Sequence, residues 1–138
     1  MVGALAAGLV LSGCSAKSSG GGGNAEGDLQ TDFGVTDDTI TLGAMTDQSA
    51  VYAALGNTLV QGNQLYFDQR NADGGICGRT VDLMVRDHGS DVQSSVSQFT
   101  ELEPQVLGFV QLLGSPQVNA VTSDIESGEI PTFIASWS

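Results

Sequence analysis

The pattern of hydrophobic and polar positions between residues 39 and 134 changes its period several times. Short β-prone or apolar runs predict four strands, and between them apolar residues recur at the spacing of a helix. The predicted strands cover residues 39–45, 80–87, 106–113 and 130–134. The resulting order β-α-β-α-β-α-β, with short connections, favours right-handed crossovers and predicts an α/β fold with a doubly wound parallel sheet.

The first predicted helix runs from about residue 52 to residue 71, and Gly74 and Gly75 follow it as residues that tolerate the positive φ of a helix stop. One side of this helix carries a stripe with a glycine in it, and the missing side chain would let the helix lie close to the sheet. The stripe consists of Leu55, Leu59, Gly62 and Tyr66.

The other two predicted helices have clear start and stop signals. Ser90 or Asp91 can cap the second helix, and Pro104 marks its end. For the third helix, Gly114-Ser115-Pro116 offers a tight turn, an N-cap and a proline at the first helical position, and Ser127-Gly128 breaks it.

The start of the chain differs in composition from the rest. Residues 1–14 are small and apolar up to Leu11-Ser12-Gly13-Cys14, which predicts a secretory signal. This run resembles the lipobox of bacterial lipoproteins, and the resemblance implies that Cys14 becomes the lipidated first residue, anchoring an exported protein to the outer face of the cell membrane. No Lys or Arg precedes Lys17, which indicates a true start site further upstream. An ordinary buried helix over residues 1–14 is the alternative.

Residues 15–36 are rich in glycine and serine and hold few large apolar side chains, which predicts a flexible linker. Residues 37–138 then form the folded part. Four Lys and Arg against sixteen Asp and Glu give a formal net charge of −12, which argues against nucleic-acid binding and against a basic membrane-surface helix. With 41% hydrophobic residues the chain can bury a core, and two cysteines are too few for a disulfide-built scaffold.

Candidate chemistry lies where the predicted strands end, because ligands of open parallel sheets bind beyond the carboxyl ends of the strands. The loops there, at 46–52, 87–91, 114–116 and 135–138, are rich in hydroxyl groups. Hydroxyls and the amide groups of helix N-termini suit a small anion such as a carboxylate, while Tyr52 and Trp137 could cover an apolar part of a ligand. A purely local role as helix caps is the alternative for each hydroxyl.

Two motifs resemble a known family. Gly34-Val35-Thr36-Asp37-Asp38-Thr39-Ile40-Thr41-Leu42-Gly43 is similar to its first-strand motif, and Asn71-Ala72-Asp73-Gly74-Gly75-Ile76-Cys77-Gly78-Arg79 is similar to its Asn-x-x-Gly-Gly-Ile-x-Gly-Arg junction. On these motifs, residues 34–138 resemble the first part of type I periplasmic binding proteins, in the Leu/Ile/Val-binding branch that serves ABC importers.

The resemblance implies a two-lobed clamp, without cofactor or metal, that binds branched-chain or other small amino acids and delivers them to an ABC permease. It is a binder and not a catalyst. The resemblance also implies that the chain is a fragment of the first lobe. After the first strand, Ser49-Ala50-Val51 departs from the Ser-Gly-Pro that is common in the family. The ligand-binding residues implied are Ser49, Tyr52, Ser115, Pro116, Gln117, Ala135, Ser136, Trp137 and Ser138.

Two other functions are open on the same fold: an extracellular ligand-sensing receptor domain, and a small α/β enzyme that uses Asp87 or His88. A metal site made of Asp87, His88 and Asp91 lacks the ligand count that such sites need. Cys77 is either half of a disulfide whose partner lies beyond Ser138 or a lone buried thiol.

Overall fold

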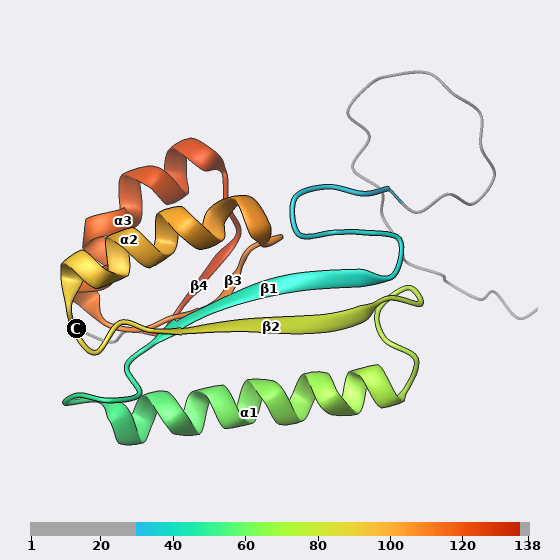
Figure 1. The fold of residues 1–138 in the computed structure, drawn as a ribbon, viewed down its shortest axis with the longest axis horizontal. Coiled ribbons are helices and arrows are strands. Elements are labelled where there is room, and N and C mark those ends of the chain that lie inside the picture. The colour runs from blue at the N-terminus through green and yellow to red at the C-terminus, as the bar shows by residue number, and fades with distance from the viewer. Residues whose placement is uncertain (1–29, 136–138) are drawn as a thin grey trace, which may run out of the picture.

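The computed structural model describes residues 30–135, which form one parallel sheet in the strand order β2-β1-β3-β4. Its strands are β1 (Thr39–Thr46), β2 (Thr80–Asp87), β3 (Phe109–Leu112) and β4 (Thr132–Ile134). The helices are α1 (Ala53–Ala72), α2 (Val92–Leu102) and α3 (Ser115–Gly128), with a short 3₁₀ turn at Glu103–Gln105. Figure 1 shows α1 on one face of the sheet and α2 and α3 on the other. The predicted doubly wound α/β fold is confirmed.

The strand register brings the carboxyl ends of the strands to one edge. β1 and β2 pair from Thr39 with Thr80 to Thr46 with Asp87, so that these two strands end side by side. Near the end of β1, Met45 pairs with Leu112 of β3. The loops that follow β1, β2 and β3 therefore start from the same edge of the sheet.

The main core lies between the sheet and the pair α2 and α3. The rings of Phe99 and Phe109 stack there, with centroids 4.9 Å apart and planes inclined by 19°. Stacked aromatic rings add to the free energy gained from apolar burial. The cluster combines residues of β1, α2, β3 and α3 and consists of Met45, Phe99, Leu102, Val106, Phe109, Leu112, Val118 and Val121.

Helix α1 packs on the sheet through a different stripe from the one expected. The prediction for Gly62 is wrong, since a Cβ atom built there meets nothing within 4 Å. The close approach is at Gly56, where a Cβ atom would lie 1.9 Å from the main-chain oxygen of Asp47. Leu55 and Tyr66 of the expected stripe are 45% and 62% exposed.

Asparagines complete the buried face of α1. Asn71 pairs with the main chain of Val81 through both its amide nitrogen (2.9 Å) and its amide oxygen (2.7 Å), and Asn63 donates to Gln111 of β3 at 2.8 Å. A hydrophobic stripe could not reveal this face, because it is built from glycine, asparagine and Phe67.

Several element boundaries also differ from the expected ones. Strand β4 starts at Thr132 and not at Ile130, because Pro131 has no N–H to donate to the ladder. Strand β3 starts at Phe109, three residues later than expected. The N-cap of α3 is Gly114, at φ 102°, and Ser115 is already helical. Asp91 is the residue that caps α2, accepting from the amide of Ser94 at 2.6 Å.

The described part of the expected linker, residues 30–36, forms isolated β-bridges between Asp32 and Val35 and between Val35 and Ile40. The predicted signal and Cys14 lie outside the described residues. Within residues 30–135, no helix combines the length and the apolar character that a membrane crossing requires. Cys77 is exposed and free among the described residues, so that the interpretation as a buried thiol is wrong.

Candidate functional site

A concavity of about 370 Å³ lies at the carboxyl edge of the sheet. All four strand-end segments contribute to it, and none of its lining side chains carries a charge. The lining residues are Val51, Tyr52, Leu55, Ser90, Leu113, Gly114, Ser115, Pro116, Gln117 and Ala135. This is the edge at which the sequence predicted a ligand.

Five of the predicted site residues meet in this concavity: Tyr52, Ser115, Pro116, Gln117 and Ala135. Ser49 does not line it, because its hydroxyl bonds to the carboxylate of Asp87. The predicted residues Ser136, Trp137 and Ser138 lie outside the described residues. Val51, Ser90 and Gly114 lie in the loops that the sequence placed at this edge but were not named as ligand-binding residues, and Leu55 and Leu113 lie outside those loops.

The loop after β1 is built around the buried carboxylate of Asp47. This group accepts hydrogen bonds from the main-chain amides of Ser49 (3.2 Å), Ala50 (2.6 Å) and Tyr52 (2.9 Å), and from the hydroxyl of Ser90 (2.5 Å). Burial alone would raise the pKa of Asp47, but these four donors outweigh it and lower the pKa from 3.8 to about 2. The carboxylate is therefore ionised at neutral pH and fixes the path of the loop that carries Tyr52.

Asp87, at the end of β2, also accepts hydrogen bonds from main-chain amides of the loops. Its Oδ1 accepts from the amides of Gln48 at 2.8 Å and Gly89 at 2.9 Å. Burial and the nearby charge of Asp47 act to raise the pKa of Asp87, yet these amides and the hydroxyl of Ser49 lower it below its usual value. This carboxylate therefore joins the loop after β1 to the loop after β2.

His88 is 3% exposed, and both of its ring nitrogens have partners. Nδ1 accepts from the amide of Ser90 at 3.1 Å, so that Nε2 carries the proton and donates to the carbonyl oxygen of Leu113 at 2.9 Å. Burial lowers the pKa of His88, although the Leu113 carbonyl and the charges of Asp47 and Asp87 favour its protonated form. The imidazole is thus a neutral link between the loops after β2 and β3. Among residues 30–135, no three His, Cys, Asp or Glu side chains are grouped so as to hold a metal.

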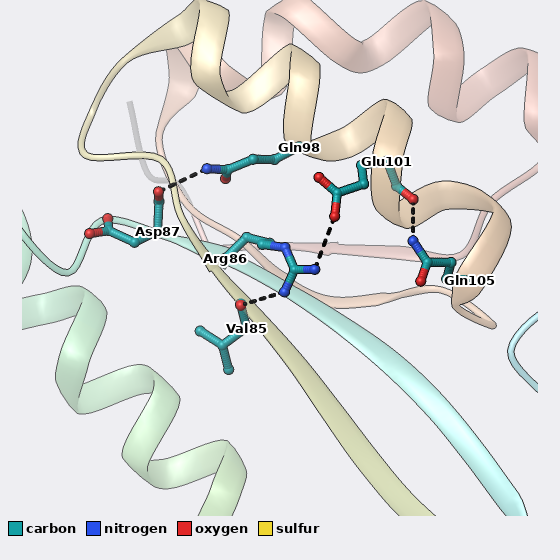
Figure 2. Close-up of polar contacts among 6 residues, drawn as sticks. All are labelled: Val85, Arg86, Asp87, Gln98, Glu101 and Gln105. Carbon is teal, nitrogen blue, oxygen red and sulfur yellow. Dashed lines mark hydrogen bonds and ion pairs between the residues drawn. The ribbon is translucent and has the colours of Figure 1, made fainter.

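Contacts between β2 and α2 hold the start of the loop after β2. Figure 2 shows Gln98 of α2 donating to the main-chain oxygen of Asp87 at 2.9 Å, and Arg86 of β2 paired with Glu101 at 3.2 Å. The ion pair is largely exposed and contributes little to stability. The bond from Gln98 joins α2 to the last residue of β2, from which the loop after β2 starts.

The N-terminus of α3 forms another wall. Gln117 is 4% exposed and donates from Nε2 to the main-chain oxygen of Ser90 at 2.9 Å. Gly114 has φ at +102°, a conformation that strains any residue with a Cβ atom, and a Cβ atom there would also displace the side-chain amide of Gln117. The first amide groups of a helix have no acceptor inside it and attract negative charge. The concavity therefore combines an anion-favouring helix end with the apolar side chains of Val51 and Leu55.

A family model of periplasmic binding proteins matches residues 39–138. The chain belongs to the periplasmic binding protein family. This confirms the resemblance to type I periplasmic binding proteins and places the chain in a family of exported binding proteins, not of enzymes. A search of curated protein sequences found no match.

Solved structures of periplasmic binding proteins share this fold. A fatty acid ABC transporter substrate-binding protein from Thermomonospora curvata is 48% identical, with a TM-score of 0.78, over 79% of this chain and 28% of that chain. The branched-chain amino acid transporter protein LivJ from Streptococcus pneumoniae, in complex with isoleucine, is 25% identical, with a TM-score of 0.65, over 73% of this chain and 30% of that chain. A solute-binding protein from R. palustris in complex with 4-hydroxybenzoate shares the fold. It is 23% identical, with a TM-score of 0.64, over 73% of this chain and 28% of that chain. The chain thus spans less than a third of the length of these three solved proteins.

Proposed function

We propose that this chain is the first part of the substrate-binding lipoprotein of an ABC importer, which binds a small carboxylate with an apolar body and delivers it to a membrane permease. Branched-chain and other small amino acids are the ligands that the sequence favours. The observation that carries the proposal is the concavity itself, in which the N-terminus of α3 faces apolar walls without a charged lining side chain.

The relatives support this class of ligand. The proteins from Thermomonospora curvata and Streptococcus pneumoniae are named for a fatty acid and for branched-chain amino acids. Both kinds of molecule have a carboxylate and an apolar body, and amino acids add an ammonium group. The described lining supplies no acidic side chain for an ammonium group, so that such a partner would come from a second lobe.

Ligand delivery would follow from closure of two lobes. A ligand that contacts both lobes binds the closed form more tightly than the open form and shifts the population towards closure. The closed form is then the signal that a permease recognises. Lipid on Cys14 would keep the binding protein beside that permease.

The test uses the complete two-lobed protein and isothermal calorimetry with L-isoleucine and with octanoate. We expect one of the two probes to bind, isoleucine if the ammonium group is recognised and octanoate if the apolar body decides. Ser115→Ala at the start of α3 should weaken the affinity about tenfold, the effect of losing one hydrogen bond to a charged group. Ser127→Ala, in the last turn of the same helix, is the matched control and should leave affinity unchanged.

Two results would count against this proposal. If neither probe binds, the ligand class is wrong. If a probe binds but Ser115→Ala retains the full affinity, the hydroxyl of Ser115 does not bind the carboxylate, and Ser115 is not a ligand-binding residue through its side chain.

A further inference from the structure

Ser90 lines the concavity and uses its main-chain groups and its side chain to bind other loops. Its amide donates to Nδ1 of His88 at 3.1 Å, and its main-chain oxygen accepts from Nε2 of Gln117 at 2.9 Å. Its hydroxyl donates to Oδ2 of Asp47 at 2.5 Å. A single residue at the wall of the site thus takes part in three hydrogen bonds to side chains.

The partners of Ser90 come from different strand ends. Asp47 follows β1, while Gln117 lies in the first turn of α3, after β3. His88, from the loop after β2, completes the connection because its Nε2 donates to the main-chain oxygen of Leu113 at 2.9 Å. We call Asp47, His88, Ser90, Leu113 and Gln117 the loop node. It connects three of the four segments that line the concavity.

The partners of Ser90 in the loop node are buried, so that their bonds are protected from competition with water. Asp47, His88 and Gln117 are 0%, 3% and 4% exposed. Ser90 itself has φ at +62°, a left-handed conformation that non-glycine residues rarely adopt. Such a conformation persists only where the surroundings determine it, and it is typical of functional sites.

We propose that Ser90 is a positioning residue for the ligand, which holds the loops after β1, β2 and β3 at the spacing that the bound molecule requires. The proposal rests on the proposed function of the concavity. Ser90 acts through Asp47 and Gln117: the former fixes the loop that carries Tyr52, and the latter fixes the start of α3.

The first test is Ser90→Ala in the complete protein, which removes the hydroxyl and leaves the main chain in place. Hydrogen exchange of the amides in residues 47–52 and 113–117 is then measured without any ligand. It should become about tenfold faster, because loss of the hydroxyl lowers the local stability of these loops and they open more often. The affinity for isoleucine or octanoate, whichever binds the wild type, should weaken by a similar factor. Ser127→Ala, a matched exposed serine, should change neither quantity.

A second variant separates positioning from stability. Ser90→Gly also lacks the hydroxyl but relieves the left-handed φ, so it should unfold at higher denaturant concentration than Ser90→Ala. We nevertheless expect both variants to show the same fast exchange and weak binding. If Ser90→Gly binds like the wild type, or if exchange in both segments is unchanged, the proposal is overturned. If the wild type binds neither probe, the proposed ligand class fails, and exchange alone decides the role of Ser90.

Discussion

The side chain of Asp47 shows how a buried charge can determine the shape of a loop beside the concavity. Four donors surround the carboxylate, and three of them are main-chain amides within five residues of it. A charged acceptor bonds more strongly than a neutral one, so that the loop after β1 has one strongly favoured conformation. The position of Tyr52 in the concavity follows from that conformation.

The pH dependence of stability tests this role. Because the pKa of Asp47 is lowered from 3.8 to about 2 in the folded state, its stabilising effect is complete above about pH 4 and is lost as the pH falls towards 2. A shift of this size corresponds to about 2 kcal/mol. Urea unfolding from pH 5 to pH 2 should show this loss in the wild type.

Asp47→Asn should unfold at lower urea concentration at pH 5 and should lack this component of the pH dependence, since the amide has no charge to lose. Taking the difference between wild type and variant at each pH cancels the contributions of groups that do not interact with Asp47. A difference that stays constant between pH 5 and pH 2 would contradict the assignment to Asp47.

At the scale of residues, the sequence predicted some of the site and missed the bonds that organise it. Tyr52, Ser115 and Pro116 of the predicted residues line the concavity, because they follow strands of a parallel sheet. The roles of Asp47 and Ser90 were not found, because the bond between them joins residues 43 positions apart. No local pattern in the sequence indicates such a partner.

At the scale of elements, α1 shows how a helix can pack without a strong apolar stripe. Gly56 lets the start of the helix lie against the main chain at Asp47, and Asn71 bonds to the main chain of Val81 near its other end. Large apolar residues such as Leu65 and Tyr66 remain exposed. Hydrophobic periodicity therefore predicted the extent of α1 correctly but the wrong face.

Substituting the two glycines of α1 tests this description. Gly56→Ala should lower the free energy of unfolding by about 1–3 kcal/mol, the usual effect of overpacking, because the new methyl group meets main-chain atoms of Asp47. Gly62→Ala, the matched control, has open space around it and should raise that free energy by about 0.5–1 kcal/mol through helix propensity. Equal effects of the two substitutions in urea unfolding would contradict the packing described here.

At the scale of the whole molecule, the order of strands and helices was predictable because each change of hydrophobic period marks an element. Strand β2 matched its predicted range in full, while β3 and β4 are shorter than expected. The start of β4 depends on Pro131, and both boundaries depend on pairing registers, of β3 with β1 and of β4 with β3, which a hydrophobic pattern does not contain. The four-strand sheet positions the whole lining of the concavity at one edge.

Membrane attachment is the prediction that belongs to this scale. If Cys14 carries lipid, Cys14→Ala should move the protein from the membrane fraction to the soluble fraction of cells, as detected by immunoblotting. Cys77→Ala replaces the other cysteine, which is exposed and free in the described structure, and should leave the protein with the membrane. Retention of the Cys14→Ala variant in the membrane fraction would rule out this anchor.

The way in which Asp47 holds its loop has a consequence for the evolution of the site. The amides that bind this carboxylate belong to the main chain of Ser49, Ala50 and Tyr52, and every residue type except proline offers such a group. The side chains of Ala50, Val51 and Tyr52 can therefore be exchanged while the backbone keeps its course, whereas Ser49 also bonds to Asp87 through its hydroxyl. Substitutions there can change the wall of the concavity one residue at a time while the scaffold stays the same.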